Sequence, residues 1–158
     1  MRTNVQIRKF EKNDVSNVVK MIRRNLREVN AKDYPGKINS LVRFYNEEYI
    51  EDVALSSNVY VAEECGKIIG MASVASWGME SSRIRALFVC PDCHGKGIGK
   101  MLIDKIKKDR INERAKKITV TSSITARHFY EKMGFKYNER RKFDGMFYNM
   151  YMENNKSV

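Results

Sequence analysis

The sequence predicts a single α/β (α+β) domain, and three observations lead to this fold class. The chain has 158 residues, of which 42% are hydrophobic, enough for one domain with a packed core. Segments that alternate polar and apolar residues are interspersed with segments whose apolar residues recur every three or four positions, the periods of strands and helices. No repeat, linker or low-complexity tract separates these segments, so we expect one domain over residues 3–153.

The first third of the chain predicts one strand and two helices. Residues 4–10 alternate in polarity, as in a strand with one buried face. A helix capped by Asn13 or Asp14 is expected to run to about Val29, because its apolar residues fall on one face. After a loop with turn residues, a second amphipathic helix is expected over about residues 38–55.

The middle of the chain predicts three consecutive strands and a helix. Residues 58–64, 67–77 and 82–90 are rich in β-branched and small apolar residues, and Gly66 marks a turn between the first two. The amphipathic run over about residues 100–113 predicts a helix with a basic, solvent-facing side.

The last third predicts a strand, a helix and a hairpin. Residues 117–122 are β-branched and short, and residues 123–133 have helical periodicity. Residues 135–143 and 146–152 are expected to pair across a turn at Asp144-Gly145. The whole order is therefore β-α-α-β-β-β-α-β-α-β-β.

A glycine-rich loop, His-Gly-Lys-Gly-Ile-Gly-Lys over residues 94–100, joins the fourth strand to the next helix. Its N–H groups are expected at the first helical turn, where roughly half a positive charge collects. Such a turn binds anions, phosphate above all, and Lys96 and Lys100 add formal charge. The spacing is neither the P-loop nor the Rossmann pattern, so by itself the loop also fits a tight turn without a ligand.

Two segments resemble signatures of the GNAT (N-acetyltransferase) superfamily. Residues 94–99 resemble its motif A, usually Gln/Arg-x-x-Gly-x-Gly/Ala, with His94 at the first position. Residues 123–135 resemble its second signature, Asn-x-x-Ala-x-x-x-Tyr-x-x-x-Gly-Phe, with Ser123 in place of the usual Asn. The order of the segments, their separation and the upstream elements also agree, so the resemblance covers nearly the whole chain.

The resemblance implies the fold, the reaction and the partners. It implies a GNAT fold, with a mixed central sheet of about six or seven strands flanked by about four helices. It also implies an acyltransferase that moves the acetyl group of acetyl-CoA to a primary amine by direct attack. The expected partner is a small-molecule or peptide amine acceptor. A homodimer remains open, and neither a membrane nor nucleic acid is expected.

The resemblance also assigns a cofactor site. An edge of the fourth strand would pair with the pantetheine arm as an added strand, the glycine loop would hold the pyrophosphate, and the second signature would lie beside the arm. The residues so assigned are Leu87, Phe88, Val89, His94, Gly95, Lys96, Gly97, Ile98, Gly99, Lys100, Ser123 and Tyr130. At Gly97 and Gly99, a Cβ is expected to push the phosphates away. A backbone N–H near Val89 would polarise the thioester carbonyl.

Tyr130 occupies the position of the family's general acid and is expected to protonate the CoA thiolate; the alternative is a core aromatic residue. The base that deprotonates the amine is less clear from the sequence. Glu80, just before the fourth strand, is one candidate, although a surface carboxylate is the simpler reading. The other candidates are a water molecule that relays the proton and three carboxylates of the second helix: Glu47, Glu48 and Glu51.

The net charge of +11 leaves other functions open. It fits a solvated basic surface, an anionic cofactor such as CoA, or a nucleic-acid-binding module. An acyl-CoA-binding domain without transferase activity is a further alternative. Arg83 and Arg85 near the expected acceptor site favour an acceptor with a carboxylate or phosphate, whereas the acidic residues from Glu47 to Asp52 argue for a cationic one.

Cys90-Pro91-Asp92-Cys93-His94 matches the pattern of covalent haem attachment, and its C-x-x-C part also occurs in zinc and redox sites. A structural zinc site needs four ligands, and we interpret the match as a chance overlap, with no metal expected. A redox role of Cys90 and Cys93 stays open. The first residues, 1–8, lack an apolar signal core and no apolar run reaches about 18 residues, so a cytoplasmic location is expected.

Overall fold

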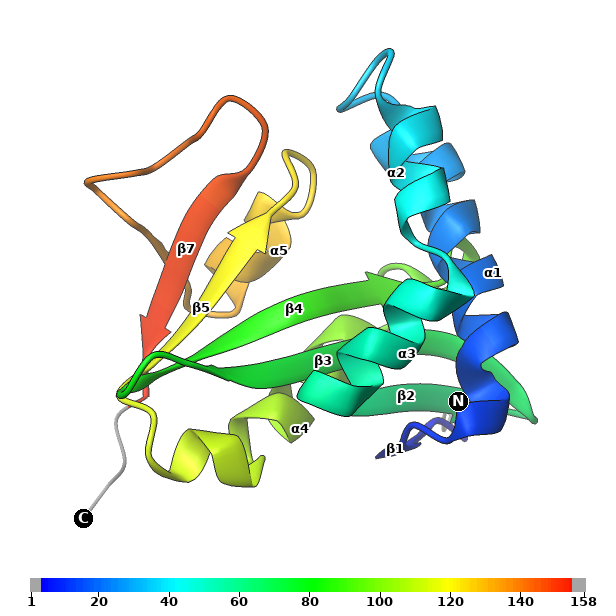
Figure 1. The fold of residues 1–158 in the computed structure, drawn as a ribbon, viewed down its shortest axis with the longest axis horizontal. Coiled ribbons are helices and arrows are strands. Elements are labelled where there is room, and N and C mark those ends of the chain that lie inside the picture. The colour runs from blue at the N-terminus through cyan, green and yellow to red at the C-terminus, as the bar shows by residue number, and fades with distance from the viewer. Residues whose placement is uncertain (1–3, 155–158) are drawn as a thin grey trace.

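The computed structural model describes residues 4–154 as a seven-stranded mixed sheet covered by helices on both faces (Figure 1). The strand order is β1-β2-β3-β4-β5-β7-β6, and all neighbours are antiparallel except β4 and β5. The strands are β1 (Gln6–Lys9), β2 (Asn58–Glu64), β3 (Lys67–Trp77), β4 (Ser81–Val89), β5 (Lys117–Ser122), β6 (Lys136–Tyr137) and β7 (Tyr148–Glu153). The predicted mixed sheet is confirmed. Residue 3, where the expected domain begins, and residues 1–3 of the N-terminal segment used to predict location lie outside the described residues.

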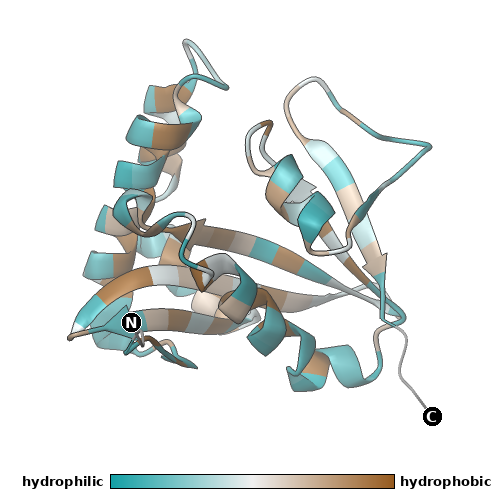
Figure 2. Cartoon of the chain, turned by 180° about the vertical axis from the view of Figure 1, so that it is seen from behind, coloured by the Kyte–Doolittle hydropathy of each residue, from teal (hydrophilic) through white to brown (hydrophobic). Residues whose placement is uncertain are grey.

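Residues 4–154 contain five α-helices: α1 (Val15–Asn25), α2 (Ile38–Phe44), α3 (Glu47–Ser56), α4 (Ile98–Lys107) and α5 (Arg127–Lys132). Helices α1 and α3 pack on one face of the sheet, and α4 and α5 pack on the other (Figure 1). Hydrophilic and hydrophobic residues alternate along the helices, as the colouring of the ribbon in Figure 2 shows. This is the amphipathic pattern from which the helices were predicted.

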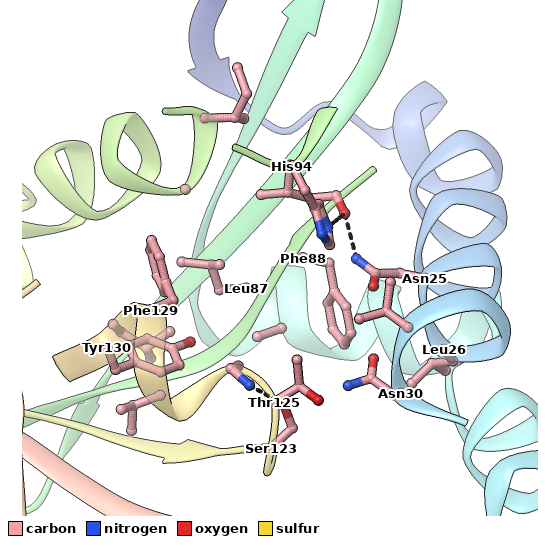
Figure 3. Close-up of a pocket in the computed structure, with 18 of the residues that line it drawn as sticks. Asn25, Leu26, Asn30, Leu87, Phe88, His94, Ser123, Thr125, Phe129 and Tyr130 are labelled. Atoms are coloured by element: carbon pink, nitrogen blue, oxygen red, sulfur yellow. Dashed lines mark hydrogen bonds between the residues drawn. The ribbon is translucent and has the colours of Figure 1, made fainter. Parts of the chain in front are cut away.

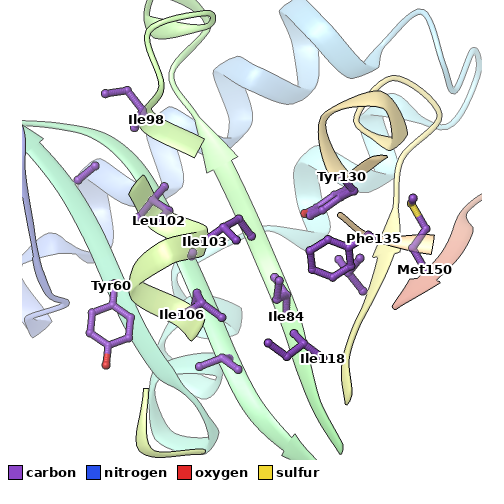
Figure 4. Close-up of a cluster of buried hydrophobic side chains, with 14 of the residues drawn as sticks. Tyr60, Ile84, Ile98, Leu102, Ile103, Ile106, Ile118, Tyr130, Phe135 and Met150 are labelled. Atoms are coloured by element: carbon purple, nitrogen blue, oxygen red, sulfur yellow. The ribbon is translucent and has the colours of Figure 1, made fainter. Parts of the chain in front are cut away.

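Each face of the sheet has its own hydrophobic core. The core under α4 and α5 contains the isoleucine-rich face of α4, together with Tyr130 and Phe135 (Figure 4). The core under α1 and α3 contains the valine and isoleucine face of α1. Leu102 of α4 and Ile22 of α1 are both fully buried, so each helix is held to the sheet by its apolar stripe.

The single helix expected over residues 38–55 is wrong, because the structure divides it into α2 and α3. Tyr45 leaves the helical conformation, with φ −82° and ψ 74°. The side chain of Asn46 then caps α3 by accepting a hydrogen bond of 2.8 Å from the N–H of Tyr49. The break turns Tyr45 toward Phe88, with 5.3 Å between the ring centroids, so it contributes to the wall of the site.

Three other expected boundaries are also corrected. Helix α4 ends at Lys107, and a separate 3₁₀ turn follows after Asp109, whose side chain caps it. Helix α5 begins at Arg127 rather than at Ser123, because the preceding residues form a turn. The C-terminal hairpin is much shorter than expected: β6 has two residues, and a long loop leads to β7.

We expect Asp14 to contribute to acid unfolding. Its carboxylate accepts hydrogen bonds of 2.8 and 2.9 Å from Arg8, and these bonds hold the pKa of Asp14 below its usual 3.8. Because the folded-state pKa is the lower one, this contribution is complete above the unfolded-state pKa and is lost as pH falls through the folded-state value. In thermal unfolding from about pH 6 to pH 2.5, Asp14→Asn should therefore flatten the acid slope of Tm. Asp52→Asn, which removes an exposed carboxylate of α3, is the control and should keep the wild-type slope.

Candidate active site

A cleft opens where β4 and β5 stop pairing. Their parallel ladder ends at Ile84 and Val120, and beyond it the two strands diverge (Figure 1). A β-bulge lies at this point, because Ser73 of β3 pairs with Ala86 whereas the adjacent Val74 pairs with Ile84, which leaves Arg85 as the extra residue. Bulges bend and twist a strand and are frequent next to active sites. The cleft contains a cavity of about 570 Å³, which we treat as the candidate active site.

The glycine loop forms one end of the cavity. Gly95 and Gly97 have φ angles of 77° and 82°, a left-handed conformation that favours glycine, and Gly97 precedes the first residue of α4. The first-turn N–H groups of α4 therefore open toward the cavity, which Gly95, Gly97 and Lys100 line. With ten residues, α4 is long enough to concentrate positive partial charge at this end.

Gly99 lines the cavity and also lies against Phe129 of α5. A Cβ at this position would lie 2.8 and 2.9 Å from two carbon atoms of the Phe129 ring, closer than real contacts allow. A side chain here would require the Phe129 ring to move, so the glycine permits the close contact between α4 and α5. At Gly97 no atom lies within 4 Å of an added Cβ, so the backbone conformation, rather than space, disfavours a side chain there.

The free edge of β4 presents backbone groups to the cleft. The N–H of Cys90 donates to the carbonyl of Ile69, on the β3 side. Because successive residues of a strand point their backbone groups to alternate sides, the N–H groups of Leu87 and Val89 point away from β3 and into the cleft. The carbonyl of Val89 is already occupied, since it accepts from the amide of Asn25 and lies 2.8 Å from Nε2 of His94 (Figure 3). The two N–H groups remain to bind a ligand.

Tyr130 reaches the cavity from α5 and is 4% exposed. Its ring packs between Phe129 and Phe135, at centroid distances of 5.2 and 5.3 Å (Figures 3 and 4). Burial raises the pKa of Tyr130 above its usual value of 10, so the hydroxyl carries its proton at neutral pH. No hydrogen bond joins this hydroxyl to another group within residues 4–154. It is therefore available to donate to a ligand.

Ser123, where the family signature usually has Asn, holds the turn before α5. Its Oγ accepts a hydrogen bond of 3.1 Å from the N–H of Ala126, and its carbonyl accepts one from the N–H of Arg127. Ser123 and Ala126 both line the cavity, and Tyr130 follows one helical turn later. Ser123 thus stabilises the turn from which α5 begins.

The structure brings together nearly all of the sequence-predicted site residues. Of the residues assigned to the cofactor, all except Lys96 line the cavity. Glu80, the expected base, does not reach it. It lies in the β3–β4 turn, at the far end of β4 from the glycine loop, and its carboxylate pairs with Lys116 at 2.8 Å. The acidic residues expected on the second helix do not line the cavity either, because they lie exposed on α3.

Several polar residues of the opposite wall were not predicted from the sequence. After α1, residues Leu26–Asn30 form a π-helical turn, and both Asn25 and Asn30 face the cavity (Figure 3). Such turns are frequent at functional sites. The sequence does show two uncharged polar residues, Asn25 and Asn30, next to the apolar stripe of the first helix. Helical periodicity does not show which other element of the fold such residues face, so it could not place them at the cavity.

The loop before α2 ties this wall to the other side of the cleft. The hydroxyl of Tyr34 donates to the carbonyl of Met146 at 2.9 Å and accepts from the N–H of Ile124 at 3.2 Å. Asp33 accepts hydrogen bonds from both the backbone and the hydroxyl of Thr125. These bonds join segments distant in sequence, so the cleft is bridged at one end.

The two cysteines of the C-x-x-C motif, Cys90 and Cys93, directly precede the glycine loop in the chain. Cys93 is buried, which raises the pKa of its thiol, whereas Cys90 is half-buried, with its sulfur 3.5 Å from a guanidinium nitrogen of Arg24. Among the described residues, no group of three or more His, Cys, Asp or Glu side chains is placed to hold a metal ion. Over the same residues, no helix has the length and apolar character that crossing a membrane requires.

Comparison with known proteins places the chain in a family. The sequence profile of the acetyltransferase (GNAT) domain matches residues 4–154. An uncharacterized N-acetyltransferase of Chlorobaculum tepidum is 29% identical over 84 residues, a match that spans 53% of each chain. The present chain thus aligns with only about half the length of this relative.

Solved structures share the fold over almost the whole chain. The PaiA N-acetyltransferase of Thermoplasma acidophilum, in complex with coenzyme A, superposes with a TM-score of 0.84 at 20% identity, covering 95% of this chain and 99% of that one. A GCN5-related N-acetyltransferase of Rhodopseudomonas palustris superposes with a TM-score of 0.78 at 21% identity, covering 97% and 98%. At these identities the structures show the fold, and the sequence profile shows the family. The chain belongs to the GNAT acetyltransferases.

Proposed function

We propose that the protein transfers the acetyl group of acetyl-CoA to a primary amine by direct attack, with Tyr130 as the general acid. One observation carries the proposal. A helix N-terminus free of side chains, a strand edge with free N–H groups and a buried, protonated tyrosine all face the same cavity. These are the three kinds of group that a thioester cofactor with a pyrophosphate needs.

In this proposal, each part of the cofactor meets a different element. The pyrophosphate lies on the N–H groups of the first turn of α4, beside Lys100. The pantetheine arm runs along β4 away from the glycine loop and accepts from the N–H of Val89. The N–H of Leu87, two residues farther from the loop and on the Tyr130 side (Figure 3), donates to the thioester oxygen, where negative charge develops. A donor aimed at such an oxyanion lowers the barrier by about 3 kcal/mol.

The reaction then needs two proton transfers. The neutral amine attacks the thioester carbon, and the tetrahedral intermediate collapses with cleavage of the C–S bond. Tyr130 donates its proton to the departing thiolate as that bond breaks. The amine nitrogen releases one proton to water in the cleft, because no carboxylate among the described residues lines the cavity. A water relay therefore takes the place of the base that was expected at Glu80.

Positive charge in the site also helps to prepare the amine. A primary amine with a pKa near 10.4 is protonated at neutral pH, and a like charge nearby favours its neutral form. Arg85 and Lys100 both line the cavity, but Lys100 lies beside the proposed pyrophosphate site and pairs with Asp104 at 2.8 Å. The field of Arg85 lowers the fraction of acceptor that is bound as ammonium, and this reduces the cost of deprotonation.

Acetyl-CoA should stabilise the protein against heat. At about 100 times its Kd, a ligand adds about 2.7 kcal/mol, which raises Tm by several degrees for a chain of this size. Release of free CoA thiol in the presence of amines, followed with a disulfide dye, then tests the transfer itself. A thermal shift without thiol release from any amine would leave only cofactor binding, and no shift would remove the cofactor from the proposal.

A charge-matched pair of variants locates the cofactor. Lys100→Gln removes a charge at the cavity, and Lys108→Gln removes one at the far end of α4. We expect the first to weaken acetyl-CoA binding up to about fivefold, the range of an exposed ion pair, and the second to leave the Kd unchanged. Substitution of Gly97 is a poorer test, because its positive φ would strain the fold.

A further inference from the structure

Two arginines of β4 lie on the face of the sheet that carries α1 and α3, and Arg85 of this pair lines the cavity. The bulge places two consecutive residues, Arg85 and Ala86, on the face of the sheet that α1 and α3 cover. By alternation along the strand, Arg83 and Phe88 lie on the same face. Leu87 lies on the opposite face, with the core under α4. The glycine loop is on the α4 side. The cofactor therefore enters from one face of the sheet and the acceptor from the other, past the arginines.

These guanidinium groups are hydrogen-bonded to hydroxyl groups. Arg85 donates to Oγ of Ser56 at 2.5 Å and to Oγ of Ser57 at 3.2 Å, at the end of α3. Arg83 donates to Oγ1 of Thr121, which lines the cavity, at 2.6 Å. The Arg83 guanidinium also lies 4.4 Å from the ring centroid of Trp77, an exposed tryptophan.

Two other half-buried arginines of the described residues, Arg8 and Arg24, are each paired with two carboxylates. Arg8 binds both Asp14 and Glu63, and Arg24 binds both Glu28 and Asp92. Within residues 4–154, neither Arg83 nor Arg85 has a carboxylate within ion-pair distance. A guanidinium has five N–H donors, so each of these two retains donors for a ligand.

The rest of the acceptor side is neutral or apolar. Asn25, Asn30 and Tyr45 are uncharged, and Leu41 and Phe147 complete the wall. No Asp or Glu among the described residues lines the cavity. A polycationic acceptor would have no counter-charge here and would be repelled, whereas an oxyanion would be attracted.

We infer that the acceptor is a primary amine that also carries an oxyanion, a carboxylate or a phosphate, and that Arg85, assisted by Arg83, binds that group. The inference rests on the proposed function and specifies its substrate class. Arginine suits this role because its planar fork binds carboxylate and phosphate through two parallel hydrogen bonds. The same positive charges that favour the neutral amine thus also select the substrate.

The test is a panel of amines assayed by release of CoA thiol. It contains ω-amino carboxylates of increasing length, phosphoethanolamine, the amide of each carboxylate, and linear diamines. We expect the carboxylates or phosphoethanolamine to have kcat/KM values about 10- to 100-fold above those of the matched amides, the range of hydrogen bonds to charged groups. Comparison of carboxylate with phosphate identifies which oxyanion fits, and the length series gives the distance between amine and anion.

Variants then assign the selectivity to a residue. Arg85→Gln should raise KM for the anionic amines about 10- to 100-fold and leave kcat/KM for the amides close to wild type. Arg110→Gln, which removes the same charge from an exposed turn after α4, should leave both unchanged. Ser56→Ala removes a partner of Arg85 but keeps the guanidinium, so the selectivity should persist even if the end of α3 loosens.

The possible failures can be told apart. Equal or better turnover of amides or diamines would overturn the inference and leave the acetyl transfer intact. An equal loss on all amines in Arg85→Gln would show that the residue only supports α3, and would overturn it too. Release of no thiol with any amine would refute the proposed function, and the inference would fall with it.

Discussion

We expect the Tyr130→Phe variant to have a kcat about 100-fold below wild type, with the Kd for acetyl-CoA within about twofold. The hydroxyl makes no hydrogen bond to another described residue, so its removal breaks no internal contact. The ring would keep its packing against Phe129 and Phe135. The effect should therefore appear in the chemical step. The fall in kcat is limited to about 100-fold because a thiol with a pKa of about 8.5 forms a fairly stable thiolate, which can leave without being fully protonated.

Single-turnover and steady-state measurements of CoA release, together with titration of acetyl-CoA, check this prediction. Tyr137→Phe is the matched control, since that hydroxyl bonds to Glu131 outside the cavity and its loss should leave kcat unchanged. Burial raises the pKa of Tyr130 above 10, so the hydroxyl should keep its proton at every pH below about 9.5. Over that pH range, deprotonation of Tyr130 should therefore cause no fall in kcat. An unchanged kcat in Tyr130→Phe would mean that the residue is only part of the core.

The second large effect is expected at Gly99. Gly99→Ala should lower the free energy of unfolding by about 1–3 kcal/mol, the cost of overpacking, because its Cβ would collide with the Phe129 ring. For this chain length, Tm should fall by about 2–4 °C for each kcal/mol. Urea unfolding of the protein without ligand measures this directly, so that the cofactor plays no part.

A double-mutant cycle identifies the source of the collision. Phe129→Ala removes the ring, so Gly99→Ala should cost little when it is made in that background. The sum of the two single effects should exceed the effect of the double variant by about 1 kcal/mol or more. Independent, additive effects would contradict the packing role. If Gly99→Ala weakened acetyl-CoA binding without affecting stability, the original reason, room for the phosphates, would be the correct one.

Local sequence patterns were enough to predict most of the elements and the side of the cavity that is proposed to hold the cofactor. The strands over residues 58–64, 67–77 and 117–122 match the structure, because alternation and β-branching are local properties of each segment. The glycine loop and the second signature were also readable, since their chemistry depends on close spacing in the chain. Both lie next to the cavity as expected.

Where periodicity was ambiguous, local capping decided the outcome. The apolar pattern over residues 38–55 continues through the break between α2 and α3, so it could not reveal that Asn46 would cap a new helix. The expected C-terminal hairpin is a regular ladder only over the two residues of β6 that pair with β7, whereas all six residues of β7 pair with β5 on the other side.

The proposed acceptor side could not be predicted from the sequence, because long-range contacts form it. The bulge at Arg85, the separation of β4 from β5 and the approach of Asn25 to the carbonyl of Val89 all join residues far apart in the chain. Glu80 was misassigned for the same reason: it is close to β4 in the sequence, but the sequence did not show that it would lie at the end of β4 far from the glycine loop. Local patterns fix periods and turns, but which polar residues share a cavity follows from long-range strand pairing and helix packing.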